Sequence, residues 1–577
     1  MKRFFSVLCT LLLCIPAFFA VMAETADDLF SDKDLTLADP SEAVDIVLTE
    51  GGVDITEPGV YRLSGQVADG SIRVAPATEG DVWLLLDGVS VHNEDGAALT
   101  SDGCDKLILT LAEGSVNSLT QGSAAPAEED NDAAIYVRDD LTINGTGALT
   151  IESAYLDGIN CRDSLRIVSG DITVSAVDDG LVGKDEVTIG GGTITISAQT
   201  GDGIKATNAE DADRGFVAIA GGTLTITTGE GSASVSQTAS DGWGGRGGWE
   251  QQAEEDMPSQ KGIKAETTLT LSGGTLSIDS VDDALHAVDV TVSGGEMTLA
   301  TGDDGVHADN ALTVSGGTIT VTRSYEGLEG TDVTLSGGEI SITASDDGIN
   351  GAGGDSATSS DEGTFGASGR FGRDRFASST GTVRISGGVI SVSASGDGVD
   401  VNGDLEMTGG ELYVNGPESG GDGALDYDGS FTLTGGTVAA VGSAGMAQGV
   451  SDPSIPGTVM NASGSGVLEV FDSAGNVLIH FETLHAYSHA VLYSDRFTDG
   501  ETYTVTMGGN SQSVQMTTDS TGGMGFGGGR GGFGGGRRET PEAMPEGGSG
   551  ERPAREPGTA PESAPPEGES GSGEEKL

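Results

Sequence analysis

Residues 271–350 read LSGGTLSIDSVDDALHAVDVTVSGGEMTLATGDDGVHADNALTVSGGTITVTRSYEGLEGTDVTLSGGEISITASDDGIN. Four Gly-Gly pairs divide this stretch, and their first members, Gly273, Gly294, Gly316 and Gly337, lie 21, 22 and 21 residues apart. Apolar and polar residues alternate on both sides of each pair, as in DVTVSGGEMTLA. Period-two alternation is typical of half-buried strands, and Gly-Gly between two such segments indicates a tight turn.

A third short segment completes each repeat and follows an acidic turn, as in DDALH, DDGVH, YEGLE and DDGIN. Each repeat therefore predicts a strand, a Gly-Gly turn, a second strand, an acidic turn and a short third strand. One such unit cannot bury its own apolar face, so the units must stack on one another. Three short strands in 21 or 22 residues correspond to one coil of a parallel β-helix, with Val, Ile, Leu and Ala inside.

Composition excludes several other classes of protein. The chain has 577 residues, of which 96 are Gly and 5% are aromatic, so a large helical protein is not expected. The 36% of apolar residues recur in short regular runs, which argues against wholesale disorder. The net charge of −63 would repel nucleic acid. The sequence patterns of leucine-rich repeats, calcium-binding nonapeptide repeats and propellers are absent.

The first residues have the pattern of a secretory signal. Lys2 and Arg3 precede an apolar stretch that runs from Phe4 to Phe19, and the small residue Ala23 predicts cleavage before Glu24. The apolar stretch is short for a membrane-spanning helix. We therefore expect a secreted, extracellular protein that does not insert into the membrane after the signal is removed.

The C-terminal part departs from the repeat. From Gly466 the chain reads GVLEVFDSAGNVLIHFE, which predicts a hairpin about Ala474-Gly475-Asn476 and a small antiparallel cap on the open end of the helix. The last residues are rich in Gly, Pro and Glu and should be disordered. The predicted organisation is a signal peptide at 1–23, a parallel β-helix domain at 24–450, a β cap at 451–516 and a disordered tail at 517–577.

Two Gly-rich insertions, around Gly229–Gln260 and Gly351–Thr380, interrupt the repeat and are expected to form surface loops. After signal removal the chain keeps only Cys104 and Cys161, and the sequence leaves open whether they pair. We expect a monomer.

The acidic turns bring carboxylates into one column. In a β-helix, equivalent positions stack about 4.8 Å apart. Carboxylates at that distance repel by about 1 kcal/mol in water and by more near the protein. A divalent cation would relieve this repulsion, and hard oxygen ligands at turns favour Ca²⁺; bare Asp-Gly turns are the alternative. The predicted calcium ligands are Asp178, Asp179, Asp202, Asp282, Asp283, Asp303, Asp304, Glu326, Glu329, Asp346 and Asp347, and the same column was extended to Asp397 and Asp422.

A second polar column follows two residues after the Gly of each acidic turn. Its members follow an apolar residue and should point outward beside the acids. For His286 and His307 we expect exposed, sugar-binding side chains rather than ligands of a transition metal, because two histidines without a third soft ligand are weak evidence for zinc. The predicted column consists of Asn160, Lys205, Lys264, His286, His307, Glu329, Asn350 and Asp400.

Several motifs resemble one known family over Val44–Ala447. They are DLTINGTGALTI, GDGIKATN, KGIKA, DDALHA, DDGVHAD, SYEGLEG and DDGIN. They are similar to secreted bacterial carbohydrate-binding β-helix proteins of the clostridial cellulose- and acidic-sugar-binding type, which are related in fold to pectate lyases. The resemblance implies an all-β, right-handed parallel β-helix, bound Ca²⁺ and affinity for plant cell-wall polysaccharide. Ala284 replaces the usual Gly and Lys261 replaces the usual Asp of the acidic turn. These two coils are therefore less certain metal sites.

The favoured function is non-catalytic, calcium-dependent binding of cellulose or of acidic sugars such as polygalacturonate. Calcium would bridge protein carboxylates to uronate carboxylates, Lys205 and Lys264 would pair with them directly, and Trp243 and Trp249 would offer apolar faces to sugar rings. One alternative is a calcium-dependent polysaccharide lyase with Lys205 or Lys264 as base, which acid-rich surroundings oppose by raising the lysine pKa. A structural surface protein or adhesin is the other.

Overall fold

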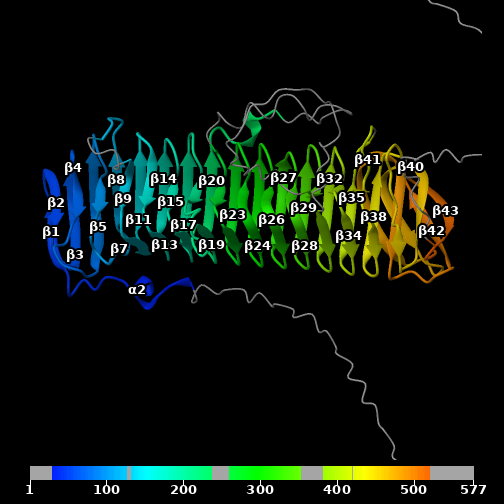
Figure 1. Cartoon of the computed structure of the whole chain (residues 1–577), viewed down its shortest axis with the longest axis horizontal. Helices are drawn as coiled ribbons and strands as arrows, with labels where there is room; N and C mark the ends of the chain where they lie inside the picture. Colours follow the sequence, from blue (N-terminus) through cyan, green and yellow to red (C-terminus); the bar gives the residue numbers. More distant parts are fainter. Residues whose placement is uncertain (1–28, 127–131, 237–258, 353–380, 419, 520–577) are drawn as a thin grey trace, which may run out of the picture. The chain divides into compact units, whose positions relative to one another are not determined.

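The computed structural model describes residues 29–126, 132–236, 259–352, 381–418 and 420–519, all within one compact unit that spans residues 1–527. Strands of successive repeats pair in parallel, and the chain winds through three sheets in each coil (Figure 1). The predicted parallel β-helix is confirmed. None of the helices in the described ranges has the length and apolar character needed to cross a bilayer.

Sheet I contains the strands that precede the Gly-Gly turns. Its strands are β1 (Val44–Leu48), β3 (Gly59–Val67), β5 (Val82–Asn93), β7 (Lys106–Leu111), β10 (Asp140–Gly145), β13 (Ser164–Ile167), β16 (Glu186–Ile189), β19 (Phe216–Ile219), β22 (Thr268–Leu271), β24 (Leu285–Val292), β26 (Val306–Val314), β28 (Leu328–Leu335), β31 (Thr382–Ile385), β34 (Asp404–Met407), β37 (Phe431–Leu433) and β39 (Asp452–Pro453).

Sheet II contains the strands that follow these turns. After the C-terminal part of β5 come β8 (Val116–Gln121), β11 (Ala148–Ser153), β14 (Asp171–Ala176), β17 (Thr193–Ala198), β20 (Thr223–Thr228), β23 (Thr275–Ser280), β25 (Glu296–Thr301), β27 (Thr318–Ser324), β29 (Glu339–Ala344), β32 (Val389–Ala394), β35 (Glu411–Asn415) and β38 (Thr437–Gly442).

Sheet III contains the short strands that follow the acidic turns, and it carries the candidate site. Its strands are β2 (Gly51–Ile55), β4 (Gly70–Val74), β6 (Leu99–Ser101), β9 (Ala133–Val137), β12 (Asp157–Cys161), β15 (Leu181–Gly183), β18 (Ile204–Ala206), β21 (Ile263–Ala265), the first residues of β24, β26 and β28, then β30 (Ile349–Gly351), β33 (Val399–Val401) and β36 (Asp426–Tyr427).

The core is a set of aliphatic columns inside the coils. In sheet II, strand β14 alternates exposed and buried residues along its whole length, as the period-two pattern predicts. Its buried Ile172 pairs with Ile194 of β17, which in turn pairs with Leu224 of β20, and all three are at most 1% exposed. Because β-branched and Leu side chains of equal register stack in this way, the interior needs few aromatic residues.

The Gly-Gly turns are required by the closeness of adjacent coils. A Cβ atom on Gly294 would lie 2.4 Å from the carbonyl oxygen of Ser272 in the preceding coil. The next residue, Gly295, has a φ of +89°, a backbone conformation that side chains with a Cβ rarely adopt. Both glycines of the pair are therefore fixed by sterics.

The cap at the C-terminal end is antiparallel, as predicted. Strand β38 pairs with the last part of β41 (Val477–Ser494), which forms a hairpin with β40 (Gly457–Phe471); β42 (Thr502–Met507) and β43 (Asn510–Gln515) extend this sheet. The hairpin turns about Gly475, as the sequence indicated. The cap has its own apolar cluster, which includes Phe481 and Tyr487.

An N-terminal segment outside the coils was not predicted. Residues 29–43 precede the first strand and contain the short helix α2 (Asp32–Leu35). Asp34 is 1% exposed and accepts hydrogen bonds from Lys106 Nζ at 2.7 Å and from Thr142 Oγ1 at 2.5 Å. This network fixes the segment to the outer side of sheet I, and a single Asp in a polar stretch gives no sequence signal for it.

Some predicted features lie outside the described residues. They are the signal peptide, nearly all of the tail, most of both Gly-rich insertions, and Trp243 and Trp249. Cys104 and Cys161 are both buried, free thiols, so the open question of a disulfide is answered in favour of unpaired cysteines.

We expect Gly294→Ala to destabilise the β-helix by about 1–3 kcal/mol, because the new methyl group would force the backbone away from the preceding coil. The midpoint of urea unfolding, followed by circular dichroism, measures the effect. Gly421→Ala is the matched control, because a Cβ at Gly421 would have no atom within 4 Å. Equal midpoints for the two variants would contradict this account of the turn.

Candidate functional site

The second polar column runs without a break through sheet III. Its members are direct Cα partners of one another in successive coils: Thr100, Tyr136, Asn160, Val182, Lys205, Lys264, His286, His307, Glu329, Asn350, Asp400 and Asp426. The register predicted from the repeat is confirmed for every residue that the prediction named. Four members were missed. Thr100 and Tyr136 lie in the less regular first coils, Val182 is apolar, and Asp426 follows an irregular coil.

The acidic turns also stack in register. The amide of the residue after each acid donates to the carbonyl of the equivalent acidic position in the next coil, as from Gly180 to Asp202 and from Gly327 to Asp347. The column in this order is Asp157, Asp179, Asp202, Lys261, Asp283, Asp304, Glu326, Asp347 and Asp397.

Two assignments in the acidic column need correction. Asp157 belongs to it and was missed. Asp422 does not belong, because Val399 bonds to the carbonyl of Ala424, which places Gly423 opposite Asp397. Ala424 occupies the position that Gly usually takes, and alignment on the nearest Gly shifted that coil by one residue.

In most acids of the column, one carboxylate oxygen accepts a hydrogen bond from a backbone amide of the next coil. Asp179 accepts from the amide of Asp202 at 2.7 Å, Asp304 accepts from the amide of Glu326 at 3.1 Å, and Asp347 accepts from the amide of Asp397 at 2.7 Å. These bonds explain why an acid recurs at this turn and why the column is largely buried; Asp202 is 0% exposed. Backbone amides therefore supply part of the compensation that the sequence assigned to calcium alone.

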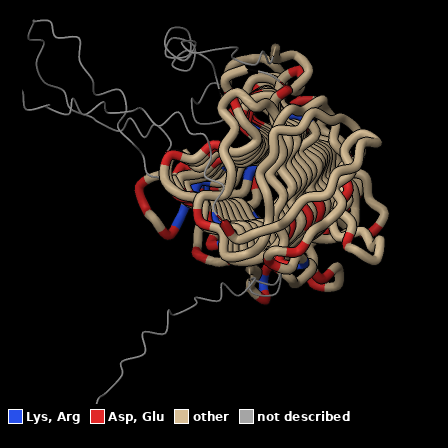
Figure 2. Tube along the Cα trace, turned by 90° about the vertical axis from the view of Figure 1, so that its right-hand side faces the viewer, with Lys and Arg blue, Asp and Glu red and all other residues tan. Residues whose placement is uncertain are grey.

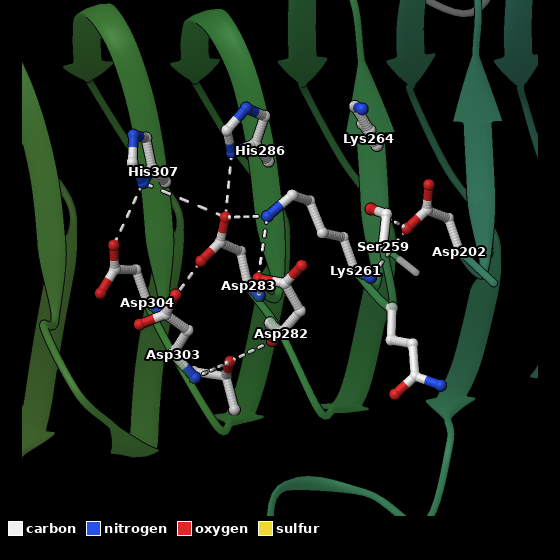
Figure 3. A network of polar contacts seen from close by, with 12 residues as sticks. Asp202, Ser259, Lys261, Lys264, Asp282, Asp283, His286, Asp303, Asp304 and His307 are labelled. Carbon is white, nitrogen blue, oxygen red and sulfur yellow. Dashed lines mark hydrogen bonds and ion pairs between the residues drawn. The ribbon is translucent and has the colours of Figure 1, made fainter. Parts of the chain in front are cut away.

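Lysines neutralise one part of the acidic column. Lys205 Nζ lies 3.2 Å from carboxylate oxygens of both Asp179 and Asp202. Lys261 Nζ lies 2.8 Å from Asp282 and 2.6 Å from Asp283 (Figure 3). Burial alone would lower the pKa of Lys205, but Asp202 and Asp179 outweigh it and raise that pKa above its usual value. Lys261 is thus the ion-pair partner of the neighbouring rung, in agreement with its departure from the acidic pattern.

Histidines neutralise the next part of the column. His286 Nδ1 lies 2.9 Å from Asp283, and His307 Nδ1 lies 3.1 Å from Asp304. The expectation that both imidazoles are exposed is wrong: their side chains are 19% and 21% exposed, because each packs between neighbouring coils. Burial would lower the pKa of His307, but bonds to Asp304 and Asp309 outweigh it and raise that pKa to about 12.

Three acids of the turns beyond Glu329 lack a basic partner within the described residues. No Lys, Arg or His of the described ranges pairs with Asp346, Asp347 or Asp397. Burial, followed by Asp400 and Asp346, raises the pKa of Asp347 to about 9. Burial also raises the pKa of Asp397 to about 9, although the amide of Gly423 opposes the shift.

A buried amide oxygen joins this acidic group. Asn350 is 2% exposed, and its Nδ2 donates to Glu326 while its Oδ1 has no hydrogen-bond donor. Carboxylates together with an amide oxygen form the hard-oxygen donor set that suits Ca²⁺. Glu326, Asp347 and Asn350 thus bring oxygen donors of this kind to neighbouring coils. In an earlier part of the column, burial and Asp179 raise the pKa of Asp157 to about 8.

The remaining predicted residues fall at the edges of these groups. Lys264 lies 3.5 Å from Glu266 and is one quarter exposed. Asp303 is exposed at the outer side of the turn, next to Asp282 and Asp283 (Figure 3). Viewed along the stack, acidic residues recur around the periphery of the coils, whereas basic residues are few (Figure 2).

One part of the chain is similar to known proteins. Residues 49–305 match a family model described as a carbohydrate-binding domain-containing protein. A protein of Acetivibrio thermocellus with the same description is 37% identical over 149 residues, which are 25% of this chain and 51% of that protein. The chain thus spans about half the length of this curated relative. The matched span includes Lys205, Lys264 and His286 and ends before His307.

A solved structure is also similar in sequence. It is described as the polysaccharide lyase-like protein from C. thermocellum, in a gadolinium derivative, and is 28% identical. It covers 47% of this chain and 96% of its own, with a TM-score of 0.36. Over residues 49–305 the chain is therefore similar to proteins described as carbohydrate-binding, and the resemblance inferred from the motifs is supported at that level.

We expect the protein in chelator to lose stability between about pH 5 and about pH 9, in part through Asp347 and Asp397. Their folded-state pKa of about 9 lies above the unfolded value, near 3.9, so the stabilisation from the protonated acids is complete below about pH 4 and is lost as the pH rises through about 9. Asp347→Asn cannot ionise and should lose less stability over this range, by at least about 1 kcal/mol.

Urea unfolding midpoints at the two pH values measure this difference. Glu152→Gln, at an exposed position of sheet II, is the control and should behave as the unaltered protein does. If Asp347→Asn and Glu152→Gln have the same pH dependence, the raised pKa of Asp347 is wrong.

Proposed function

We propose that the outer side of sheet III binds polysaccharide without chemical conversion. The observation that carries this proposal is the unbroken register of the column from Lys205 onward, which places a polar side chain on each successive coil, about 4.8 Å apart. A ligand whose own units repeat can contact such a column at several points, so weak single contacts add together. The match of residues 49–305 to a carbohydrate-binding family supports the same function.

The charges along the column favour an acidic or neutral sugar polymer of the plant cell wall, cellulose or polygalacturonate. Lys205, Lys264, His286 and His307 occupy successive positions of the column and are its basic residues. Their side chains are between 19% and 25% exposed, so the tips reach solvent while the stems are packed. Lys264 has the weakest ion pair of the four and is the best placed to meet a sugar carboxylate.

Calcium belongs to the same proposal. Glu326, Asp346, Asp347 and Asn350 would hold the ion, for the reasons of donor chemistry given above. Bound Ca²⁺ supplies a positive centre that an acidic protein needs in order to hold an acidic polymer. We place this activity outside the cell, as the N-terminal signal pattern predicts.

The lysine environment argues against the lyase alternative. Proton abstraction next to a uronate carboxylate requires a neutral lysine near the working pH. Asp179 and Asp202 raise the pKa of Lys205 and so keep it protonated. Lys205 is therefore held in the wrong protonation state for that role.

We expect Lys264→Gln to weaken retention on immobilised polygalacturonate by about threefold to tenfold, because it removes one charge-assisted contact. Affinity electrophoresis in gels that contain the polymer measures the change. Lys184→Gln is the charge-matched control, since Lys184 is exposed and lies outside the column. Equal losses for both variants would show a nonspecific charge effect, and an ultraviolet signal from unsaturated sugar would reject the non-catalytic function.

We also expect chelator to lower both the melting temperature and retention on polygalacturonate, because removal of Ca²⁺ leaves the acidic group around Asp347 uncompensated. The double variant Asp346→Asn, Asp347→Asn should melt at a temperature that chelator changes little. Differential scanning calorimetry with and without added Ca²⁺ gives the comparison. Lower melting with unchanged retention would favour a purely structural role for calcium, and no effect of chelator on either would reject the calcium sites.

A further inference from the structure

The centre of sheet III contains the one place where two histidines occupy consecutive rungs. His286 of β24 pairs with His307 of β26, which pairs with Glu329 of β28. The two imidazole rings lie against each other, with centroids 4.8 Å apart and ring planes tilted by 39°. The four other histidines of the chain lie outside this column, so the pair is a local feature of these coils.

Carboxylates approach both sides of the rings. On the inner side, Asp283 Oδ2 lies 2.9 Å from Nδ1 of His286 and 4.0 Å from Nδ1 of His307, so both nitrogens face one oxygen (Figure 3). On the outer side, Asp309 Oδ1 lies 3.9 Å and 3.6 Å from the two Nε2 atoms. When a metal ion replaces the Nδ1 proton, a carboxylate near the far nitrogen holds the remaining proton on Nε2.

Two sets of ligand atoms converge here and share His307. One consists of Asp283, His286 and His307, and the other of Asp304, His307 and Glu329; within each set, the atoms lie within 4.8 Å of one another. In the second set, His307 Nδ1 is 3.1 Å from Asp304 and 3.4 Å from Glu329. Ligand atoms of a tetrahedral zinc site, with bonds of about 2.0–2.1 Å, are about 3.3 Å apart.

The two sets differ in what else they contact. Asp283 Oδ2 is already bonded by Lys261 Nζ at 2.6 Å. Among the described residues, no Lys or Arg pairs with Asp304 or Glu329. These two acids stand on neighbouring coils on either side of one imidazole, and His307 is the basic group that contacts both of them. A divalent cation bound beside His307 would also contact both acids.

We propose that His307, Asp304 and Glu329 bind one divalent transition metal ion of the Zn²⁺ class, with His286 as the neighbouring nitrogen donor. One imidazole and two carboxylates on adjacent coils provide three protein ligands from rigid strands, and a fourth position remains for His286 or water. The imidazole ligand distinguishes this site from the group around Asp347, which has only oxygen donors and suits Ca²⁺. The proposal does not depend on polysaccharide binding.

The test uses the full-length chain, freed of metal by chelator and returned to buffer with excess Ca²⁺ so that oxygen-only sites are filled. Isothermal titration with Zn²⁺ should show one ion per chain. Co²⁺ should give the visible absorption of a nitrogen- and oxygen-ligated site, and Cu²⁺ should give nitrogen hyperfine coupling in its electron paramagnetic resonance spectrum. The last measurement needs no variant.

His307→Gln should weaken Zn²⁺ binding at least tenfold, and Glu329→Gln should also weaken it. His480→Gln is the matched control, because His480 contacts Glu469 on the cap and should leave binding unchanged. Circular dichroism establishes that each variant folds, and His286→Gln replaces His307→Gln if the latter does not.

Three results would overturn the proposal. They are no Zn²⁺ uptake in the presence of Ca²⁺, uptake that His307→Gln leaves unchanged, and a Cu²⁺ spectrum without nitrogen coupling. The first would mean that the histidines serve only as ion-pair partners of the acids. The others would mean that carboxylates alone hold the ion.

Discussion

The backbone hydrogen bonds between successive coils are the constraint on which this molecule depends. They hold every coil in register with the next, so that any residue type repeated in the sequence becomes a continuous column in space. The steric demand at Gly294 and Gly295 keeps the coils at that spacing. The aliphatic core, the acidic turns and the polar column of sheet III all follow from the same register.

The same register stacks carboxylates whose charges repel one another, and the groups that balance this charge differ along the column. Asp179 and Asp347 each give one oxygen to a backbone amide of the next coil. The charge that remains is balanced by Lys205 and Lys261 in one region and by imidazoles in the next. Around Asp347 the described residues offer no basic side chain, burial raises the pKa of this acid, and this is the group for which we propose calcium. One repeated turn thus yields three chemically distinct surfaces.

This division would allow a strongly acidic protein to bind the acidic polymer that we propose. The basic side chains are few, but they occupy neighbouring rungs of one sheet. Their carboxylate partners are mostly buried beneath them, as Asp202 and Asp283 are. The tips of the Lys and His side chains remain accessible while the acids that balance them are withdrawn from solvent.

The sequence by itself determined the three-stranded coil, the parallel stacking, the antiparallel cap and the register of Lys205 with Lys264 and of His286 with His307, because these depend on periodicity alone. Tertiary structure decided what periodicity does not encode. Ala424 stands where most coils have Gly, so the predicted alignment of that coil was wrong by one residue. The structure also added Asp157 to the acidic column and showed that Asp34 holds a segment outside the coils. Burial and partner choice of each acid and imidazole depend on contacts between coils, and those contacts exist only once the chain has folded.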